Sequence, residues 1–445
     1  MQYDSIIEYL NNKNMIGLKQ ILNDSGKEDI LNVFYDLSNK DQVIVYRLLS
    51  KDMALDIFEE LDTDEQQNLL RSFTDEQAIE AINELAPDDR VRLLDELPAM
   101  VAKKFLAGIS SEERVTTNLL MGYEAQTAGR IMTPEFVHLH KGITAGAALE
   151  VIKAQAVEKE TIYTIYIVDA KGVLEGVISL RALLIAAYDT KVEDIMETIS
   201  ANVSTSTDQE EVAKLLQKMD WLAVPVVDKE NRLVGIVTID DAIDILQQET
   251  TEDFAKMSAI TPINKSYDKI SVWEIVKARS PWLLVLMVSA TFTHMVIEMF
   301  EAALEVMPVL YAAIPMLMDT AGNAGTQSST TIVRAMSLNE VQLKNILYIM
   351  WKEIRVAVYC GIILAIANFG RMLFFTSANA TVALVVSITL VMTVFVAKAI
   401  GSALPLLAER IKLDPAVMSA TVVTTIADVL ALIVYFNIAR ALLNI

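Results

Sequence analysis

The last part of the chain is dominated by long hydrophobic runs that begin after Ser280. A helix of about 20 apolar residues crosses roughly 30 Å of membrane hydrocarbon, because each residue adds about 1.5 Å. The runs are long enough for this and are separated by short polar stretches. The pattern predicts five membrane-spanning helices, which cover residues 281–300, 303–336, 346–369, 380–407 and 415–443.

Basic residues between the predicted spans indicate the orientation. One side of the predicted membrane has only Arg371 and Arg440. Because Lys and Arg are enriched in cytoplasmic loops, we expect a multi-pass protein of the plasma membrane with its N-terminus in the cytoplasm and its C-terminus outside. The lack of a signal-peptide pattern after Met1 agrees with this expectation. The basic residues of the other side are Lys277, Arg279, Arg334, Lys344, Lys352, Arg355, Arg410 and Lys412.

Two of the predicted spans are more polar than a membrane anchor needs to be. The second contains Pro315 followed by a run rich in Gly, Asn, Gln, Ser and Thr, which only helix packing or a wet cavity can accommodate. The fifth contains Asp428 about thirteen residues after it begins, near mid-membrane, where an unpaired charge costs at least about 3 kcal/mol. Asp428 therefore indicates an ion path. The alternative is a structural Asp that hydrogen-bonds to Thr424 or Thr425, one turn away.

The first 130 residues have apolar positions at helical spacing, interrupted by polar turns about every 12 residues. The stretches 61–73, 74–85 and 87–98 each carry Thr, Asp or Pro near their start, residues that commonly begin helices. Acidic residues crowd these starts, as at Asp88 and Asp89, where they favour the positive end of the helix dipole. The pattern predicts a superhelical stack of short helices, an α-solenoid.

The middle of the chain contains an internal duplication. The stretch 131–134 is echoed 64 positions later at 195–197, and Gly176 recurs 59 positions later as Gly235. Each copy has the pattern of a helix, a β-branched strand, a turn, a second strand and a helix. Tandem copies of such a β-α-β-β-α unit resemble a pair of CBS domains. The two copies span residues 131–194 and 195–250.

Paired CBS domains often bind adenine nucleotides through a turn with a Gly, a Ser or Thr three residues later, and an Asp after three more. The second copy has this turn as Gly235, Thr238 and Asp241. In the first copy Ser179 is followed by Ala182 where the Asp is expected. The resemblance implies a candidate ATP site at Thr238 and Asp241 and leaves open whether the pair binds nucleotide.

The composition combines a hydrophobic character with a strong negative charge. Hydrophobic residues make up 53% of the chain and the mean hydropathy is +0.37, yet the net charge is -21. Residues 1–268 hold 25 basic and 48 acidic residues, against 12 and 10 in the rest. Such an acidic part repels nucleic acid and attracts cations. The single Cys360 excludes a disulfide framework and a thiolate metal site.

Many acidic residues lie on or just after the second copy of the duplication. Carboxylates this dense repel one another unless cations screen them, and Mg²⁺ or Ca²⁺ prefers oxygen ligands. A solvated acidic face explains the composition equally well. The stretch leads into the amphipathic segment 249–280, which is expected to enter the membrane at Pro281. The acidic residues are Asp208, Glu210, Asp220, Asp240, Asp241, Asp244, Glu249, Glu252 and Asp253.

The order of these parts resembles the MgtE family of magnesium channels and transporters over nearly the full length. The most specific matches are the stretches 251–253, 300–301, 315–327, 414–416 and 424–428. The resemblance implies a multidomain fold with a cytoplasmic α-helical superhelical domain, an α+β tandem CBS pair, a connecting helix and an all-α transmembrane domain of five helices. These parts cover residues 1–130, 131–250, 251–280 and 281–445.

The resemblance also implies roles for individual residues. In a homodimer, two copies of Asp428 would hold a largely hydrated Mg²⁺ ion across the symmetry axis, and Asn323 would supply a polar contact nearby. Regulatory Mg²⁺ between the cytoplasmic domains would keep them compact and the pore shut, and its loss would let carboxylates repel one another. Arg92, one turn after Asp88, departs from this acidic pattern. The matching regulatory positions are Asp88, Asp208, Glu210, Asp220, Asp241, Asp244, Glu249, Glu252, Asp253 and Asp414.

Three functions are compatible with this organisation. The first is a Mg²⁺-selective channel for influx, with Mg²⁺, the lipid bilayer and a second copy of the chain as partners. The second is a secondary exchanger of a divalent metal such as Co²⁺ or Mn²⁺, with Asp428 as a proton relay. The third is a CBS-regulated membrane enzyme or sensor, but the sequence has no His/Cys ligand set, nucleophile motif or phosphate-binding loop to support it. We therefore expect a transporter that is not an enzyme.

Overall fold

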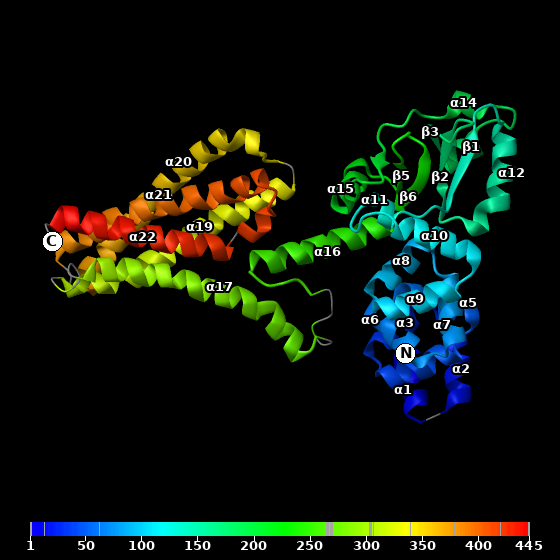
Figure 1. The fold of residues 1–445 in the computed structure, drawn as a ribbon, viewed down its shortest axis with the longest axis horizontal. Coiled ribbons are helices and arrows are strands. Elements are labelled where there is room, and N and C mark those ends of the chain that lie inside the picture. Colours follow the sequence, from blue (N-terminus) through cyan, green and yellow to red (C-terminus); the bar gives the residue numbers. More distant parts are fainter. Residues whose placement is uncertain are drawn as a thin grey trace. The chain divides into compact units, whose positions relative to one another are not determined.

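The structure is a computed structural model with two compact units, Met1–Gln247 and Gln248–Ile445 (Figure 1). It describes the chain except for residues 1, 13, 62, 264–266, 268–269, 302–304, 306, 339, 377–378, 419 and 444–445.

The first unit begins with ten short helices around one hydrophobic core, as the sequence predicts. The hydroxyl groups of Ser38, Ser50, Thr74 and Ser110 each accept a backbone N–H at a helix start, which satisfies a donor that the helix cannot. The helices are α1 (Gln2–Asn11), α2 (Met15–Asp24), α3 (Lys27–Asp36), α4 (Asn39–Leu48), α5 (Lys51–Glu60), α6 (Thr63–Ser72), α7 (Asp75–Glu84), α8 (Pro87–Glu96), α9 (Ala99–Gly108) and α10 (Ser111–Met121).

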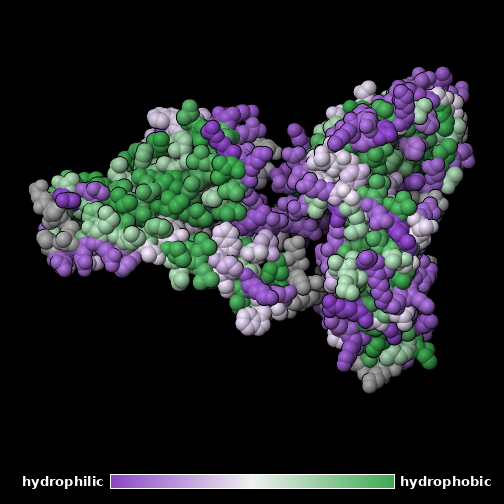
Figure 2. All heavy atoms as spheres, in the orientation of Figure 1, coloured by the Kyte–Doolittle hydropathy of each residue, from purple (hydrophilic) through white to green (hydrophobic). Residues whose placement is uncertain are grey.

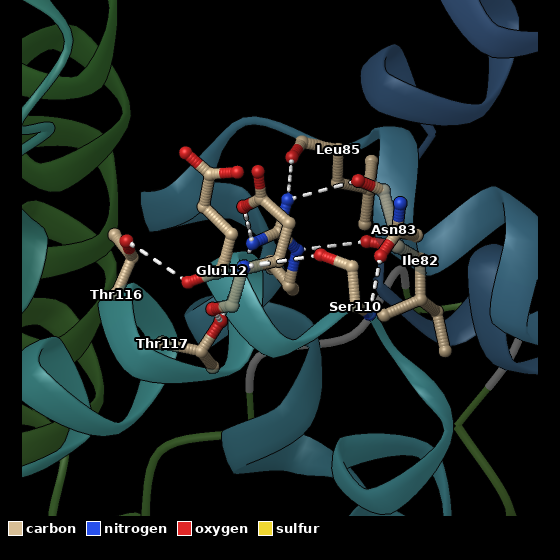
Figure 3. A network of polar contacts seen from close by, with 9 residues as sticks. Ile82, Asn83, Leu85, Ser110, Glu112, Thr116 and Thr117 are labelled. Atoms are coloured by element: carbon tan, nitrogen blue, oxygen red, sulfur yellow. Dashed lines mark hydrogen bonds and ion pairs between the residues drawn. The ribbon is translucent and has the colours of Figure 1, made fainter.

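A buried polar side chain recurs every 24 residues in this helical domain. Gln42, Gln66 and Arg90 each donate to a backbone carbonyl eight residues earlier, at 2.9, 2.7 and 2.8 Å. Arg90 also donates to the carbonyls of Asn83 and Leu85, a network that can be followed in Figure 3. These bonds satisfy one of the last carbonyls of a helix from the helix that follows it, and because they recur at every second helix the repeat is two helices long.

The CBS pair forms two three-stranded sheets, each with a parallel and an antiparallel strand pair. This is the predicted β-α-β-β-α order, and α16 continues past the second sheet into the second unit. The first copy contains β1 (Phe136–His140), α12 (Ala145–Gln155), β2 (Thr161–Val168), β3 (Leu174–Ser179) and α13 (Leu180–Ile185). The second contains β4 (Val203–Ser204), α15 (Gln209–Met219), β5 (Ala223–Val227), β6 (Leu233–Thr238) and α16 (Ile239–Met257). Two short helices, α11 (Ala128–Ile131) and α14 (Val192–Ile195), precede the copies.

The two copies exchange the segments that precede them. Thr133, ahead of β1, pairs through both backbone bonds with Ile236 of β6. Glu197, ahead of β4, pairs in the same way with Val177 of β3. The positional offsets of 64 and 59 residues noted in the sequence therefore describe one pseudo-symmetric module.

Apolar and ionic contacts join the helical domain to the CBS pair within the first unit. Val91 of α8 and Leu120 of α10 belong to the same buried cluster as the core of the second copy. Arg130 of α11 donates to both carboxylate oxygens of Asp95 on α8, at 2.9 and 2.6 Å. Hydrophobic burial and a bidentate ion pair thus connect the two domains directly.

The second unit is all-helical and carries large apolar side chains on its surface, which appears green in Figure 2. Its central helix is α21, which packs against α19, α20 and α22. The elements are α17 (Val272–Met299), η2 (Pro308–Ala313), α19 (Ile314–Ser337), η3 (Leu343–Asn345), α20 (Ile346–Phe375), α21 (Ala380–Arg410), η4 (Pro415–Met418) and α22 (Ala420–Leu443).

Four stretches in the described part of the chain are long and apolar enough to cross a membrane: those of α17, α20, α21 and α22. The remaining predicted span contains α19, a helix of 24 residues that is more polar than these. The count of five spans therefore stays a prediction. The helix that contains the first predicted span, α17, starts at Val272 and includes Pro281. The segment 251–280 is not one helix, since its first residues complete α16 and its last belong to α17.

Candidate ion path and acidic regulatory sites

Asp428 lies on α22 where this helix packs against α19. A side-chain carbon at Gly322 of α19 would lie only 2.8 Å from Thr424 Cγ2 and 3.7 Å from Asp428 Oδ1, so the two helices are in close contact. Asp428 Oδ1 is buried and has no hydrogen-bond partner among the described residues. Burying a carboxylate oxygen without a partner costs free energy, and this oxygen can accept a hydrogen bond or bind a cation.

A polar stripe runs along α19 beside this carboxylate. Asp319, Asn323 and Gln327 are spaced four residues apart and are exposed in the single chain. On the opposite side of α19, small residues such as Ala321 and Ala324 are buried. Asp319 is close enough to Asp428 for their charges to interact. The stripe and the carboxylate can together offer oxygen atoms to a hydrated cation.

A second group of carboxylates lies in the first unit, between α8 and the start of α16. Burial and the charges of Asp241, Asp89 and Glu160 raise the pKa of Asp88 well above its usual value. Burial and the charge of Asp240 raise the pKa of Asp241 to about 7. Asp88 Oδ1 is buried without a hydrogen-bond partner among the described residues. The structure thus brings Asp88 and Asp241, two of the predicted regulatory positions, close enough for their charges to interact.

Arg92 supplies positive charge to this group. Its Nη2 lies 2.6 Å from Asp89 Oδ1, and its Nη1 lies 3.9 Å from Asp244 Oδ2. Burial lowers the pKa of Arg92, but the charges of Asp89 and the other carboxylates outweigh this effect and raise it. A guanidinium therefore lies where a cation between α8 and α16 would be stabilised.

A third group lies in the second unit, at the end of α16. The Lys256 ammonium is 2.5 Å from Glu252 Oε1 and 2.6 Å from Asp414 Oδ2. Burial lowers the pKa of Lys256, but its bonds to Asp414 and Glu252 outweigh this effect and raise it. Two of the predicted regulatory carboxylates are thus brought together, with a lysine between them.

The other predicted regulatory residues lie at separate places. Asp208 caps α15 by accepting the backbone N–H of Glu210, and Glu210 pairs with Lys214 at 2.6 Å. Asp220 ends α15 in the left-handed conformation, with φ 53°. Glu249 and Asp253 lie on α16. In the described ranges no three His, Cys, Asp or Glu side chains converge closely enough to enclose a bare ion. A Mg²⁺ ion that keeps its water can still be held by more widely spaced carboxylates.

The nucleotide candidates belong to the acidic group between α8 and α16. Thr238 Oγ1 donates to Asp241 Oδ2 at 2.9 Å. A cavity of about 240 Å³ lies instead beside the first copy, between β3, the segment 195–201 and the start of β5. Ser179, Ala182, Tyr166 and Asp220 line it. Burial raises the pKa of Tyr166, whose hydroxyl has no partner among the described residues.

Sequence reasoning missed a buried polar connection in the second unit. Lys398 of α21 is only 5% exposed, and its Nζ donates to Ser328 Oγ at 3.3 Å. Ser328 in turn donates to Glu353 Oε2 at 2.6 Å. The signal was present, because Lys398 interrupts an otherwise apolar stretch from 380 to 407. Its partners could not have been identified, since they come from two other helices.

Comparisons with known proteins match the helical domain, the CBS pair and much of the second unit. A family model described as a divalent cation transporter matches residues 314–438, the MgtE intracellular N domain matches 26–126, and CBS domains match 128–189 and 192–248. The magnesium transporter MgtE of Thermus thermophilus is 38% identical over 331 residues, which cover 74% of this chain and 73% of that protein. The magnesium transporter MgtE of Bacillus subtilis is 33% identical over 347 residues, 76% of this chain and 74% of that protein.

Two solved structures resemble the first unit. The crystal structure of the cytosolic domain of the Mg²⁺ channel MgtE in complex with ATP has a TM-score of 0.52 and 35% identity, and the match covers 55% of this chain and 99% of that one. The crystal structure of the soluble part of a magnesium transporter has a TM-score of 0.51 and 35% identity, and the match covers 56% and 98%.

Proposed function

The chain belongs to the MgtE family of magnesium transporters, and from this premise we propose that it is a Mg²⁺-selective channel for influx, gated by intracellular Mg²⁺. The observation that carries the proposal is the buried, unpartnered Oδ1 of Asp428 beside the polar stripe of α19. Because Mg²⁺ gives up its water reluctantly, a path of carboxylate and amide oxygens suits the hydrated ion better than a dry cage does.

We propose that a second copy of the chain completes the path. The exposed polar stripe of Asp319, Asn323 and Gln327 supports this, since polar side chains on a membrane helix are costly to expose to lipid. In a symmetric dimer two stripes and two copies of Asp428 would face one ion. The N-terminus would lie in the cytoplasm and the C-terminus outside the plasma membrane, as the basic loops predict.

The test of the pore is Mg²⁺ influx into vesicles that contain the purified full chain and a Mg²⁺-sensitive dye. Asp428→Ala is expected to abolish influx while the protein keeps its assembly state. The matched control is Asn437→Ala, an exposed polar residue on the same helix, which is expected to leave influx unchanged. Wild-type influx through Asp428→Ala would contradict the pore assignment.

The exchanger of Co²⁺ or Mn²⁺ is the alternative for the same carboxylate. A channel moves Mg²⁺ down its electrochemical gradient, so a membrane potential alone drives influx. An exchanger with Asp428 as proton relay needs a counter-ion. Influx that responds to voltage and is unaffected by collapse of the proton gradient supports the channel; influx that stops with the proton gradient supports the exchanger.

We propose that the gate uses the acidic groups of the cytoplasmic part. Asp88, Asp241 and Asp244 between α8 and α16, and Glu252 and Asp414 beside η4, would hold hydrated Mg²⁺ at high internal concentration. Asp208, Glu210, Asp220, Glu249 and Asp253 are proposed as further ligands. When Mg²⁺ leaves, repulsion among these carboxylates favours a more open arrangement.

ATP is proposed as a second regulatory ligand. A related cytosolic domain has been solved with ATP, and the cavity beside the first CBS copy is lined by Tyr166, whose buried hydroxyl has no partner among the described residues. Thr238 and Asp241 form the other candidate site. Isothermal titration of the full chain with ATP, repeated with Tyr166→Phe and with Asp241→Asn, distinguishes the two, because only the variant in the true site lowers the affinity.

A further inference from the structure

Lys398 places a charge deep inside the second unit. It lies twelve residues before the end of α21, about 18 Å along the helix axis. Only 5% of the residue is exposed, so its ammonium does not reach a membrane surface in the way that lysines near helix ends do. A charge at such a position is energetically unfavourable unless it is paired and hydrogen-bonded. The transport step proposed above does not use it.

Ser328 connects this ammonium to Glu353 on a third helix. A hydroxyl can accept one hydrogen bond while it donates another, and both are formed here, from Lys398 at 3.3 Å and to Glu353 at 2.6 Å. The opposite charges of α21 and α20 are therefore joined through α19. We call Lys398, Ser328 and Glu353 the three-helix tie.

The tie lies one turn from the closest approach of α19 and α21. A methyl group at Gly401 would overlap the carbonyl oxygen of Gly325, so the two backbones touch there. Ser328 follows Gly325 by three residues and Lys398 precedes Gly401 by three, and the long lysine side chain reaches Ser328 Oγ at 3.3 Å. A contact between glycines is smooth and does not by itself fix the rotation of a helix. Directional hydrogen bonds one turn away do fix it.

The rotation of α19 decides which of its side chains face the proposed path. Ser328 lies directly after Gln327, so the buried tie and the exposed polar stripe are about 100° apart around the helix, from 3.6 residues per turn. We propose that Lys398 is a positioning residue for transport. Through Ser328 and Glu353 it holds α19 in the rotation that presents Asn323 and Gln327 beside Asp428. This inference rests on the proposed function, because it assumes that the stripe of α19 faces the ion path.

The pairing also explains which changes the fold should tolerate. Removal of the Glu353 charge leaves the buried Lys398 ammonium without its opposite charge, whereas removal of both charges can be nearly neutral for stability. A double neutral variant, Lys398→Met with Glu353→Gln, is therefore expected to fold and yet to lose the tie. Ser328→Ala keeps both charges and removes only the connecting hydroxyl.

Cysteine reactivity can report the rotation of α19 without reference to activity. Cys360 is the only cysteine, so a Cys360→Ala background is free of thiols. Single cysteines are introduced at Asn323 and Gln327 on the exposed stripe and at Ala321 and Ala324 on the buried side. Full chains in vesicles are treated with a small cationic methanethiosulfonate reagent. In the parent we expect the stripe positions to react at least about tenfold faster than the buried positions.

In the Ser328→Ala and double neutral backgrounds, the reaction rates at the stripe and buried positions are expected to differ by less than about threefold. Mg²⁺ influx is expected to fall as this contrast falls. Ser387→Ala is the matched control, because it removes another buried hydroxyl of α21 that bonds Asn368 of α20 and not α19. Its contrast is expected to equal that of the parent.

The outcomes separate the two proposals. A contrast that persists in both tie variants overturns the positioning role and leaves the proposed path intact. Unreactive cysteines at 323 and 327 in the parent overturn the path and this inference together. If the double neutral variant does not fold, Ser328→Ala alone decides, since it removes neither charge.

Discussion

The Lys256 ammonium lies 2.6 Å from Asp414 Oδ2 and so joins the last turn of α16 to the short helix that precedes α22. The same ammonium is 2.5 Å from Glu252, one turn earlier on α16. A single positive charge thus compensates two carboxylates that are candidate Mg²⁺ ligands. The chain supplies a cation of its own at a position where the proposed gate would use a metal.

In Lys256→Met, we expect the end of α16 to stay in contact with the segment at Asp414 only when Mg²⁺ is bound. Each partly exposed ion pair contributes roughly 0.2 to 1 kcal/mol, so its loss should raise cleavage beside the exposed Phe254 by about two- to fivefold without Mg²⁺. Millimolar Mg²⁺ is expected to restore protection. Chymotrypsin digestion of the full chain measures the rate, since this protease does not require the lysine.

Lys229→Met, on the exposed hairpin of the second CBS copy, is the control and should leave the cleavage rate unchanged. If Lys256→Met is cleaved at the wild-type rate with and without Mg²⁺, the lysine does not hold α16 in place.

Arg92 is expected to play the corresponding part between α8 and α16. In Arg92→Ala the carboxylates of Asp89 and Asp244 lose their nearest positive charge, and repulsion among them should loosen α8. Hydrogen exchange of α8 is expected to quicken about two- to tenfold without Mg²⁺ and to return toward the wild-type rate when Mg²⁺ is added. The exposed Arg181→Ala is the control. Equal exchange in Arg92→Ala and wild type at every Mg²⁺ concentration would contradict this role.

Glu59 gives the first unit a pH dependence of known sign. Burial and the charges of Asp89 and Asp56 raise its pKa to about 7, against an ordinary value of 4.5. The unfolded chain therefore releases this proton first as the pH rises, and the contribution of Glu59 to stability falls between about pH 4.5 and 7. After allowance for solvent screening of a half-buried group, the loss is about 1 to 2 kcal/mol.

Glu59→Gln is expected to remove this loss, so that hydrogen exchange of α5 becomes slower than in wild type at pH 8 and equal to it at pH 4. The exposed Glu28→Gln on α3 should show no such difference. A slowing of similar size at both pH values would mean that packing, and not charge, is responsible.

Local pattern was enough to predict most of the fold. The helix starts at Thr74 and Pro87 and the two β-α-β-β-α copies follow from periodicity, caps and turns that lie within a few residues of one another. The start of α17 did not follow, because residues 251–280 were expected to form one connecting helix that enters the membrane at Pro281. In the structure Ser271 caps the helix with a capping box, ten residues earlier.

The sequence identified the acidic residues of the candidate sites but not the basic residues that pair with them. Asp88, Asp241 and Asp428 were identifiable because carboxylates are conspicuous in a dense cluster or in an apolar run. The partners Lys256 with Asp414, and Lys398 with Glu353 through Ser328, are separated by tens to more than a hundred residues. Only the packing of distant helices brings them together, and no spacing rule in one sequence encodes that packing.

The crossing of α19 and α21 allows a prediction with a close internal control. A methyl group at Gly401 would overlap backbone atoms of Gly325, which cannot move aside as a flexible side chain can. Gly401→Ala should therefore push the helices apart at a cost of about 1 to 3 kcal/mol. Gly370 on α20 has open space around it, so Gly370→Ala should be neutral or slightly stabilising, because Ala favours a helix over Gly by about 1 kcal/mol. The fraction of the detergent-solubilised full chain that stays monodisperse after heating measures both. If the two variants withstand heat equally, the close approach of Gly325 and Gly401 is wrong, and the register that places Ser328 against Lys398 is wrong with it.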